Sequence, residues 1–259
     1  GIVSGFNGES LTNASAKLSL RGRDLRSGRV QGKFSSAPFS AQVTHTDRGG
    51  SSVTIETLDA GSTLRFADIY KRMYGGKLIM TSALNDGPQP GSVQIRNFIL
   101  RNEPALSSIM AQGPATSEVT DARGRKFVVQ NAGNDVEFDR LRAIFTRTGS
   151  RIDISDAAIS NPAMGFTMTG FLDTAKERTD INGTFVPLYG LNNVVSQLPI
   201  LGQLLGGGRN EGLFALNFRV SGRLAKPDVS VNPLSALAPG ILRKLFSAGG
   251  GNDGIAGAS

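Results

Sequence analysis

The strongest constraint on the fold is a two-residue alternation of apolar and polar side chains in short runs. It is clear in residues 17–21 (KLSLR), 52–56 (SVTIE) and 93–98 (VQIRNF). Glycine, aspartate and proline separate the runs, and the chain contains 33 glycines. This pattern predicts strands with one apolar and one polar face, joined by tight turns into an antiparallel sheet.

Helical periodicity is limited to a few segments. Residues 63–74 carry an apolar stripe at helical spacing, with Ser62 or Thr63 as the cap and Gly75 and Gly76 as the stop. A second short helix is predicted over 102–113. Because strands and helices do not alternate regularly, a parallel sheet is not expected. We predict a mainly β fold: an elongated antiparallel sheet with a few short amphipathic helices, especially at the C-terminal end.

The most apolar segment is residues 183–208, GTFVPLYGLNNVVSQLPILGQLLGGG. Polar residues and prolines interrupt it, whereas a membrane-spanning helix needs about 20 predominantly apolar residues. It predicts a strand followed by two short amphipathic helices, and residues 235–247 predict a basic amphipathic helix. These end helices would either close the sheet or lie on anionic lipid. Their apolar positions are Leu191, Val194, Val195, Leu198, Leu201, Leu204, Leu205, Ile241, Leu242, Leu245 and Phe246. Residues 248–259 are expected to be a disordered tail.

Few residues carry the signature of catalysis. The chain has no cysteine, which excludes disulfides and thiol nucleophiles. The single histidine, His45, lies in a strand-like run, and no nucleophile-elbow motif accompanies it. Asp153 and Asp156 are three residues apart, so in a regular strand they would point to opposite faces and form no acid–base pair. We predict no catalytic residue, no metal site, no cofactor and no enzymatic activity.

The net charge and the glycine-rich segment indicate an anionic partner but do not identify it. The net charge of +7 favours anionic partners without choosing among them. The glycines at 206–208 form either a phosphate cradle or a flexible helix end. The basic residues are dispersed rather than interleaved with aromatic residues, so we predict no nucleic-acid site.

The alternating runs define an apolar face with two interpretations. It is either an ordinary core covered by a second layer, or the lining of a lipid-binding groove. The predicted lining consists of Leu18, Leu20, Val53, Ile55, Leu78, Met80, Val93, Ile95, Ile152, Ile154, Phe166, Met168, Leu216, Phe218 and Val220.

Several blocks of sequence bear on that choice. They are Asp59–Phe66, Ile69–Gly76, Gly183–Asn192, Pro199–Gly202, Glu211–Phe214, Val220–Gly222 and Lys226–Gly240, the last reading KPDVSVNPLSALAPG. Taken in this order, they resemble the C-terminal region of AsmA-like proteins, near the YhdP and TamB relatives of Gram-negative envelopes. The resemblance implies that the sheet is curled and groove-like over residues 1–182, with an AsmA-like C-terminal end over 183–247.

The resemblance also implies a function and a location. Such a chain would be a segment of a bridge-like periplasmic protein that conducts phospholipids between the inner and outer membranes. Its inner-membrane anchor would lie outside this fragment, and its distal end would lie near the outer membrane. The alternative is an adaptor module with a closed, dry core that docks an outer-membrane or periplasmic protein. An enzyme acting on envelope lipids or glycans is a third hypothesis.

Overall fold

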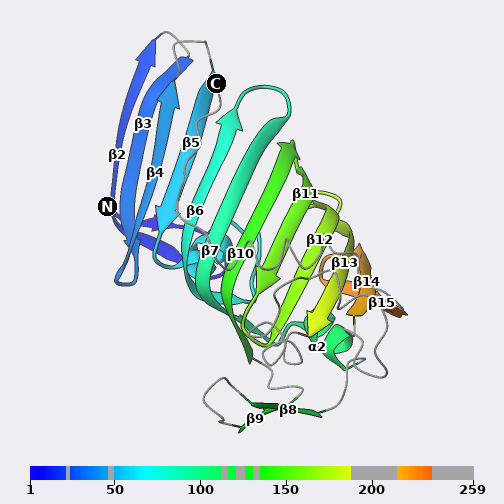
Figure 1. The fold of residues 1–259 in the computed structure, drawn as a ribbon. Helices are drawn as coiled ribbons and strands as arrows, with labels where there is room; N and C mark the ends of the chain where they lie inside the picture. Colours follow the sequence, from blue (N-terminus) through cyan, green and yellow to red (C-terminus); the bar gives the residue numbers. More distant parts are fainter. Residues whose placement is uncertain are drawn as a thin grey trace, which may run out of the picture.

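The fold is dominated by one large antiparallel sheet. The structure, a computed structural model, describes residues 1–21, 24–45, 50–111, 116–120, 126–130, 135–187 and 215–234. In these residues thirteen strands form the sheet shown in Figure 1. The prediction of a mainly β fold with few helices is confirmed. The predicted curl is not observed: the sheet is open and uncurled, with β1 and β15 as its two separate edges.

The strand order follows the chain almost throughout. The order across the sheet is β1 (Val3–Ser4), β2 (Ser10–Arg21), β3 (Asp24–Phe34), β4 (Ala37–His45), β5 (Ser51–Thr57), β6 (Met73–Leu84), β7 (Gln89–Arg101), β10 (Asp135–Thr148), β11 (Arg151–Ser160), β12 (Met164–Asp173), β13 (Arg178–Pro187), β14 (Ala215–Arg223) and β15 (Lys226–Leu234). The boundary predicted between residues 182 and 183 falls inside β13, so the sheet continues across it.

A separate two-stranded hairpin interrupts this order between β7 and β10. It consists of β8 (Thr116–Thr120) and β9 (Lys126–Gln130), which pair with each other only. The end helices predicted at 191–205 and 241–246, and the tail at 248–259, lie outside the described residues.

Both predicted short helices are present, with shifted bounds. The first, α1 (Ala60–Phe66), begins earlier than predicted because Asp59 is the cap and its carboxylate accepts the Ser62 N–H at 2.9 Å. It also ends earlier, and Met73 already belongs to β6. The second, α2 (Pro104–Met110), has its proline in the first turn, where a missing N–H costs nothing.

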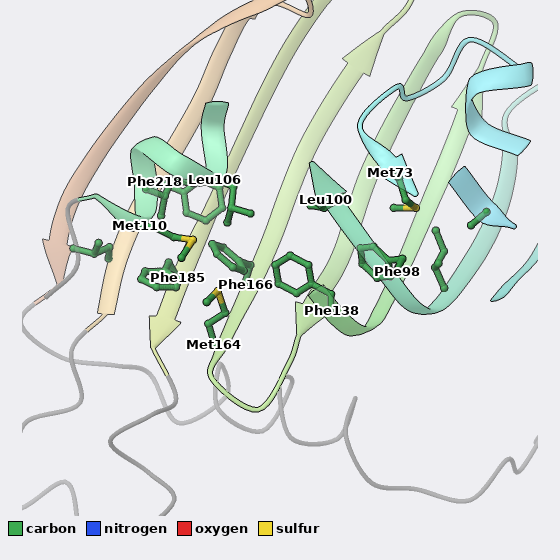
Figure 2. Close-up of a cluster of buried hydrophobic side chains, with 14 of the residues drawn as sticks. Met73, Phe98, Leu100, Leu106, Met110, Phe138, Met164, Phe166, Phe185 and Phe218 are labelled. Atoms are coloured by element: carbon green, nitrogen blue, oxygen red, sulfur yellow. The ribbon is translucent and has the colours of Figure 1, made fainter. Parts of the chain in front are cut away.

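The buried core gathers at the end of the sheet that α2 covers. Figure 2 shows five phenylalanines from five strands lying side by side: Phe98, Phe138, Phe166, Phe185 and Phe218. The ring centroids of Phe98 and Phe138 are 5.6 Å apart, and those of Phe166 and Phe185 are 4.9 Å apart. Leu106, Ile109 and Met110 of α2 are buried in the same cluster. The helix therefore covers the apolar side chains of β14 and β15 at this end.

Truncation of this aromatic cluster should be costly. We expect Phe138→Ala to lower the free energy of unfolding by about 3–5 kcal/mol, because it removes a fully buried ring and leaves a cavity. Ile144 lies on the same strand with its side chain 45% exposed, so Ile144→Ala should change stability by less than about 1 kcal/mol. Urea unfolding followed by circular dichroism measures both. Equal losses for the two variants would contradict this assignment of the core.

Candidate functional site

The most distinctive feature of the molecule is a row of small and apolar residues that crosses twelve strands. Each member is the direct cross-strand partner of the next, so all of them face the same side of the sheet. This central row consists of Ala16, Val30, Ala41, Ile55, Met80, Val93, Ala143, Ala157, Met168, Gly183, Phe218 and Val231. With strands about 4.8 Å apart, the row is about 50 Å long.

Two further rows flank the central row on the same face. On the side of α2 lies the buried row: Thr57, Leu78, Ile95, Leu141, Ile159, Phe166, Phe185 and Leu216. On the other side lies the outer row: Leu18, Gly28, Val43, Val53, Ser82, Gly91, Phe145, Ile154, Gly170, Ile181, Val220 and Val229. We call the surface made by the three rows the apolar face.

All fifteen residues predicted to line a groove lie on this one side of the sheet. Thirteen belong to the three rows, and Ile152 is one step beyond the outer row. Leu20 is two residues past Leu18 in β2 and so shares its side. Their exposure is graded: Ile95 is 3% exposed and Leu216 1%, whereas Leu18 is 62% and Leu20 63% exposed. Residues of the central row such as Met80, Val93 and Met168 are half-buried.

Sequence reasoning missed several members of the apolar face. Leu141, Ala143 and Phe145 alternate and could have been found from that pattern, but the intervening Ile144 obscured it. Phe98 is harder to assign, because it lies three residues after Ile95 and is nevertheless buried in the same cluster. Asn97 between them has a φ of 55°, a left-handed conformation that breaks the alternation.

Two glycines leave space for aromatic rings of the neighbouring strands to lie against the backbone on the apolar face. Gly183 is the cross-strand partner of Phe218, and a Cβ at this glycine would lie 2.3 Å from the Phe218 Cζ. Gly91 has the same relation to Phe145, with a corresponding distance of 2.6 Å. Each ring therefore extends across the position where the neighbouring strand has no side chain.

The opposite side of the sheet, which we call the polar side, carries cross-strand ion pairs, although Ala158, Val186 and Ala215 are buried on it. Arg219 donates to both carboxylate oxygens of Asp180 at 2.9 and 2.7 Å. These hydrogen bonds hold the pKa of Asp180 below its ordinary value. Arg142 and Asp156 form a longer pair at 3.4 Å.

The expected separation of Asp153 and Asp156 is wrong. The register shifts between Ile154 and Ala157, so Ser155 is an extra residue and both aspartates lie on the polar side. Asp153 pairs with Arg151 at 2.7 Å, while Asp156 pairs with Arg142.

His45 is half-buried, and its Nδ1 lies 2.9 Å from the Ser51 hydroxyl.

A polar cluster of Tyr70, Arg72 and Glu103 lies at the start of α2. The Tyr70 hydroxyl donates to Glu103 at 2.5 Å, and another Glu103 oxygen accepts the Ala105 N–H at 3.2 Å. Burial, together with the Glu103 charge, raises the pKa of Tyr70 far above its ordinary value. Arg72 completes the cluster at 3.8 Å from Glu103.

Comparison with family models, with curated proteins and with solved structures finds no match. In the described residues there is no group of histidine, cysteine, aspartate and glutamate side chains that would hold a metal ion. The helices in those residues are also too short or too polar to cross a membrane.

Tyr70 should make stability sensitive to alkaline pH. Its pKa is raised by folding, so its hydrogen bond stabilises the protein fully below the ordinary tyrosine pKa of about 10 and less as pH rises above it. Tyr70→Phe should lower the free energy of unfolding by about 1–3 kcal/mol at neutral pH. Above about pH 10, the free energy of unfolding should fall less steeply with pH in the variant than in the wild type. Urea unfolding at pH 7 to 11 measures both effects. An unchanged alkaline slope in the variant would contradict the assignment.

Proposed function

We propose that this chain is a segment of a bridge-like protein that binds phospholipid acyl chains along the apolar face and conducts them across the strands. The observation that carries the proposal is the central row, whose members are cross-strand partners over twelve strands without a charged residue among them. The protein has no catalytic role in this proposal, because moving a lipid along a surface makes and breaks no covalent bond.

The dimensions of the face suit acyl chains. The hydrocarbon core of a bilayer is about 30 Å thick and holds two acyl chains end to end. A row of about 50 Å therefore has room for about three chain lengths. Each methylene that leaves water is stabilised by about 0.8 kcal/mol. Because the row is continuous, a chain can advance by one strand without losing its apolar surroundings.

The openness of the sheet suits the headgroup. A charged headgroup is costly to bury without a partner, so it must stay in contact with water while the acyl chains are bound. An open sheet allows this, since the two edge strands do not close the face into a tube. The headgroup would lie away from the buried row and toward the outer row, where Val53, Ile154 and Val220 are half-buried.

The resemblance to AsmA-like proteins supports a cellular location for this activity. It suggests the periplasm of a Gram-negative cell, with an anchor in the inner membrane and a distal end near the outer membrane. Outer-membrane biogenesis is then the process that the chain serves. The phospholipid and the two membranes are the partners proposed, and no cofactor is required.

Gentle purification followed by mass spectrometry of extracted lipid tests the proposal directly. Phospholipid should co-purify in a stoichiometric amount with the folded protein. A photocrosslinking amino acid at Val93 or Val220, both half-buried on the apolar face, should capture that lipid. A folded, monodisperse sample that is free of lipid would reject the proposal and favour an adaptor with a dry core.

A matched pair of substitutions on β12 should separate the two faces. Met168 belongs to the central row, while the next residue, Thr169, is exposed on the polar side. We expect Met168→Asp to reduce co-purified lipid at least about tenfold, because a charge interrupts the apolar row. Thr169→Asp should leave it unchanged. The amount of lipid per protein, measured by mass spectrometry, decides the outcome.

Folding must be checked in the same samples. If Met168→Asp unfolds the protein, Val53→Asp and Thr54→Asp give a second pair, since Val53 lies in the outer row away from the aromatic cluster. Thermal unfolding identifies the variants that remain folded. Equal lipid in both folded members of a pair would contradict a role for the apolar face.

A further inference from the structure

We propose that the outer edge of β2 is a docking site for one more β-strand, supplied by a partner polypeptide that carries apolar residues on one side and acidic residues on the other. The proposal rests on backbone pairing, exposure and charge at this edge. It does not depend on lipid binding.

The edge is only partly occupied. β1 pairs with Ser10 and Leu11, and the Gly1 carbonyl accepts the Ala14 N–H at 2.8 Å. Within the described residues, no strand pairs with the outer side of β2 beyond this point. Because successive N–H groups of a strand point to opposite sides, those of Ala16, Leu18 and Leu20 point outward together with that of Ala14. They form a row of donors for strand addition.

The side chains at the edge are those of an interior strand. Leu18 and Leu20 continue the apolar face to the border of the sheet, where they are 62% and 63% exposed. A strand added here with apolar residues on the same side would cover both leucines. It would also lengthen the apolar face by one strand.

The other edge of the sheet is built differently. β15 contains Pro227 and Pro233, which have no N–H to donate to a further strand. Prolines in edge strands are a common protection against unwanted pairing. In addition, α2 packs against β14 and β15. The two edges are therefore unequal, and β2 is the one suited to accept a partner.

Charge selects the partner. On the polar side, Lys17 lies directly opposite Arg29, and like charges at such a position are unfavourable. Within the described residues, Lys17 has no acidic partner. A second copy of this chain, pairing through β2, would add another lysine. A partner strand with an acidic residue opposite Lys17 would instead offset the repulsion.

A synthetic peptide in which valine alternates with glutamate is the probe. We expect the fluorescently labelled peptide to bind the full chain, measured by anisotropy, and to slow hydrogen exchange of residues 15–21. Ala16→Pro removes an outward donor while leaving the pairing with β3, and should weaken binding at least about tenfold. Ala16→Val keeps the donor and is the matched control.

Charge reversal provides a second readout that does not require the proline variant to fold. Lys17→Glu should weaken binding of the glutamate peptide about two- to fivefold and strengthen binding of a peptide with lysine in its place. Equal binding by the wild type and a folded Ala16→Pro variant would overturn the proposal, as would an unchanged preference after charge reversal.

The other occupants are distinguished in the same experiments. A concentration-dependent dimer that Ala16→Pro abolishes would assign the edge to a second copy of the chain. Protection of residues 15–21 by vesicles of phosphatidylcholine and phosphatidylglycerol, without binding of either peptide, would assign it to a membrane surface. Either result would overturn the proposed partner strand.

Discussion

Cross-strand register is the constraint on which the rest of the structure depends. In a strand, a slip of one residue moves every side chain to the other side of the sheet. The central row exists because eleven successive pairings, from Ala16↔Val30 to Phe218↔Val231, keep the apolar members aligned. A slip at any one strand would place polar side chains in the row and apolar ones in water. Hydrophobic burial at the end covered by α2 opposes such slips, because it fixes Phe166, Phe185 and Leu216 in place.

The alternation in the sequence was sufficient to assign the side of the sheet for the fifteen predicted residues. It could not assign the side for residues near irregular positions. Asn97 and the extra Ser155 each reverse the side that the following residues face. The same irregularity brought Asp153 and Asp156 to one side. The start of α1 was also misplaced, because Ser62 and Thr63 suit a helix cap as well as Asp59, which caps it in the structure. Curvature of the whole sheet depends on many small twists that no local pattern specifies.

The two sides of the sheet differ in the interactions that their side chains make. Charged side chains pair across strands on the polar side, as in Asp180 and Arg219, where water weakens each interaction. On the apolar face, packing changes from the buried row to the exposed Leu18. The buried row thus stabilises the fold, while Leu18 and Leu20 at the β2 border remain accessible. The polar cluster of Tyr70, Arg72 and Glu103 holds α2 near the aromatic cluster.

The nearly sequential strand order has a consequence for how such a sheet can change in length. Most strands pair with their neighbours in the chain, so a strand contacts little beyond the strands on either side. Insertion or loss of a whole hairpin preserves the antiparallel order, and it also preserves the side on which each apolar residue lies. The architecture is in this respect quasi-one-dimensional, like that of repeat proteins. Evolution can therefore adjust the reach of the apolar face two strands at a time, while the aromatic cluster and α2 at its end remain intact.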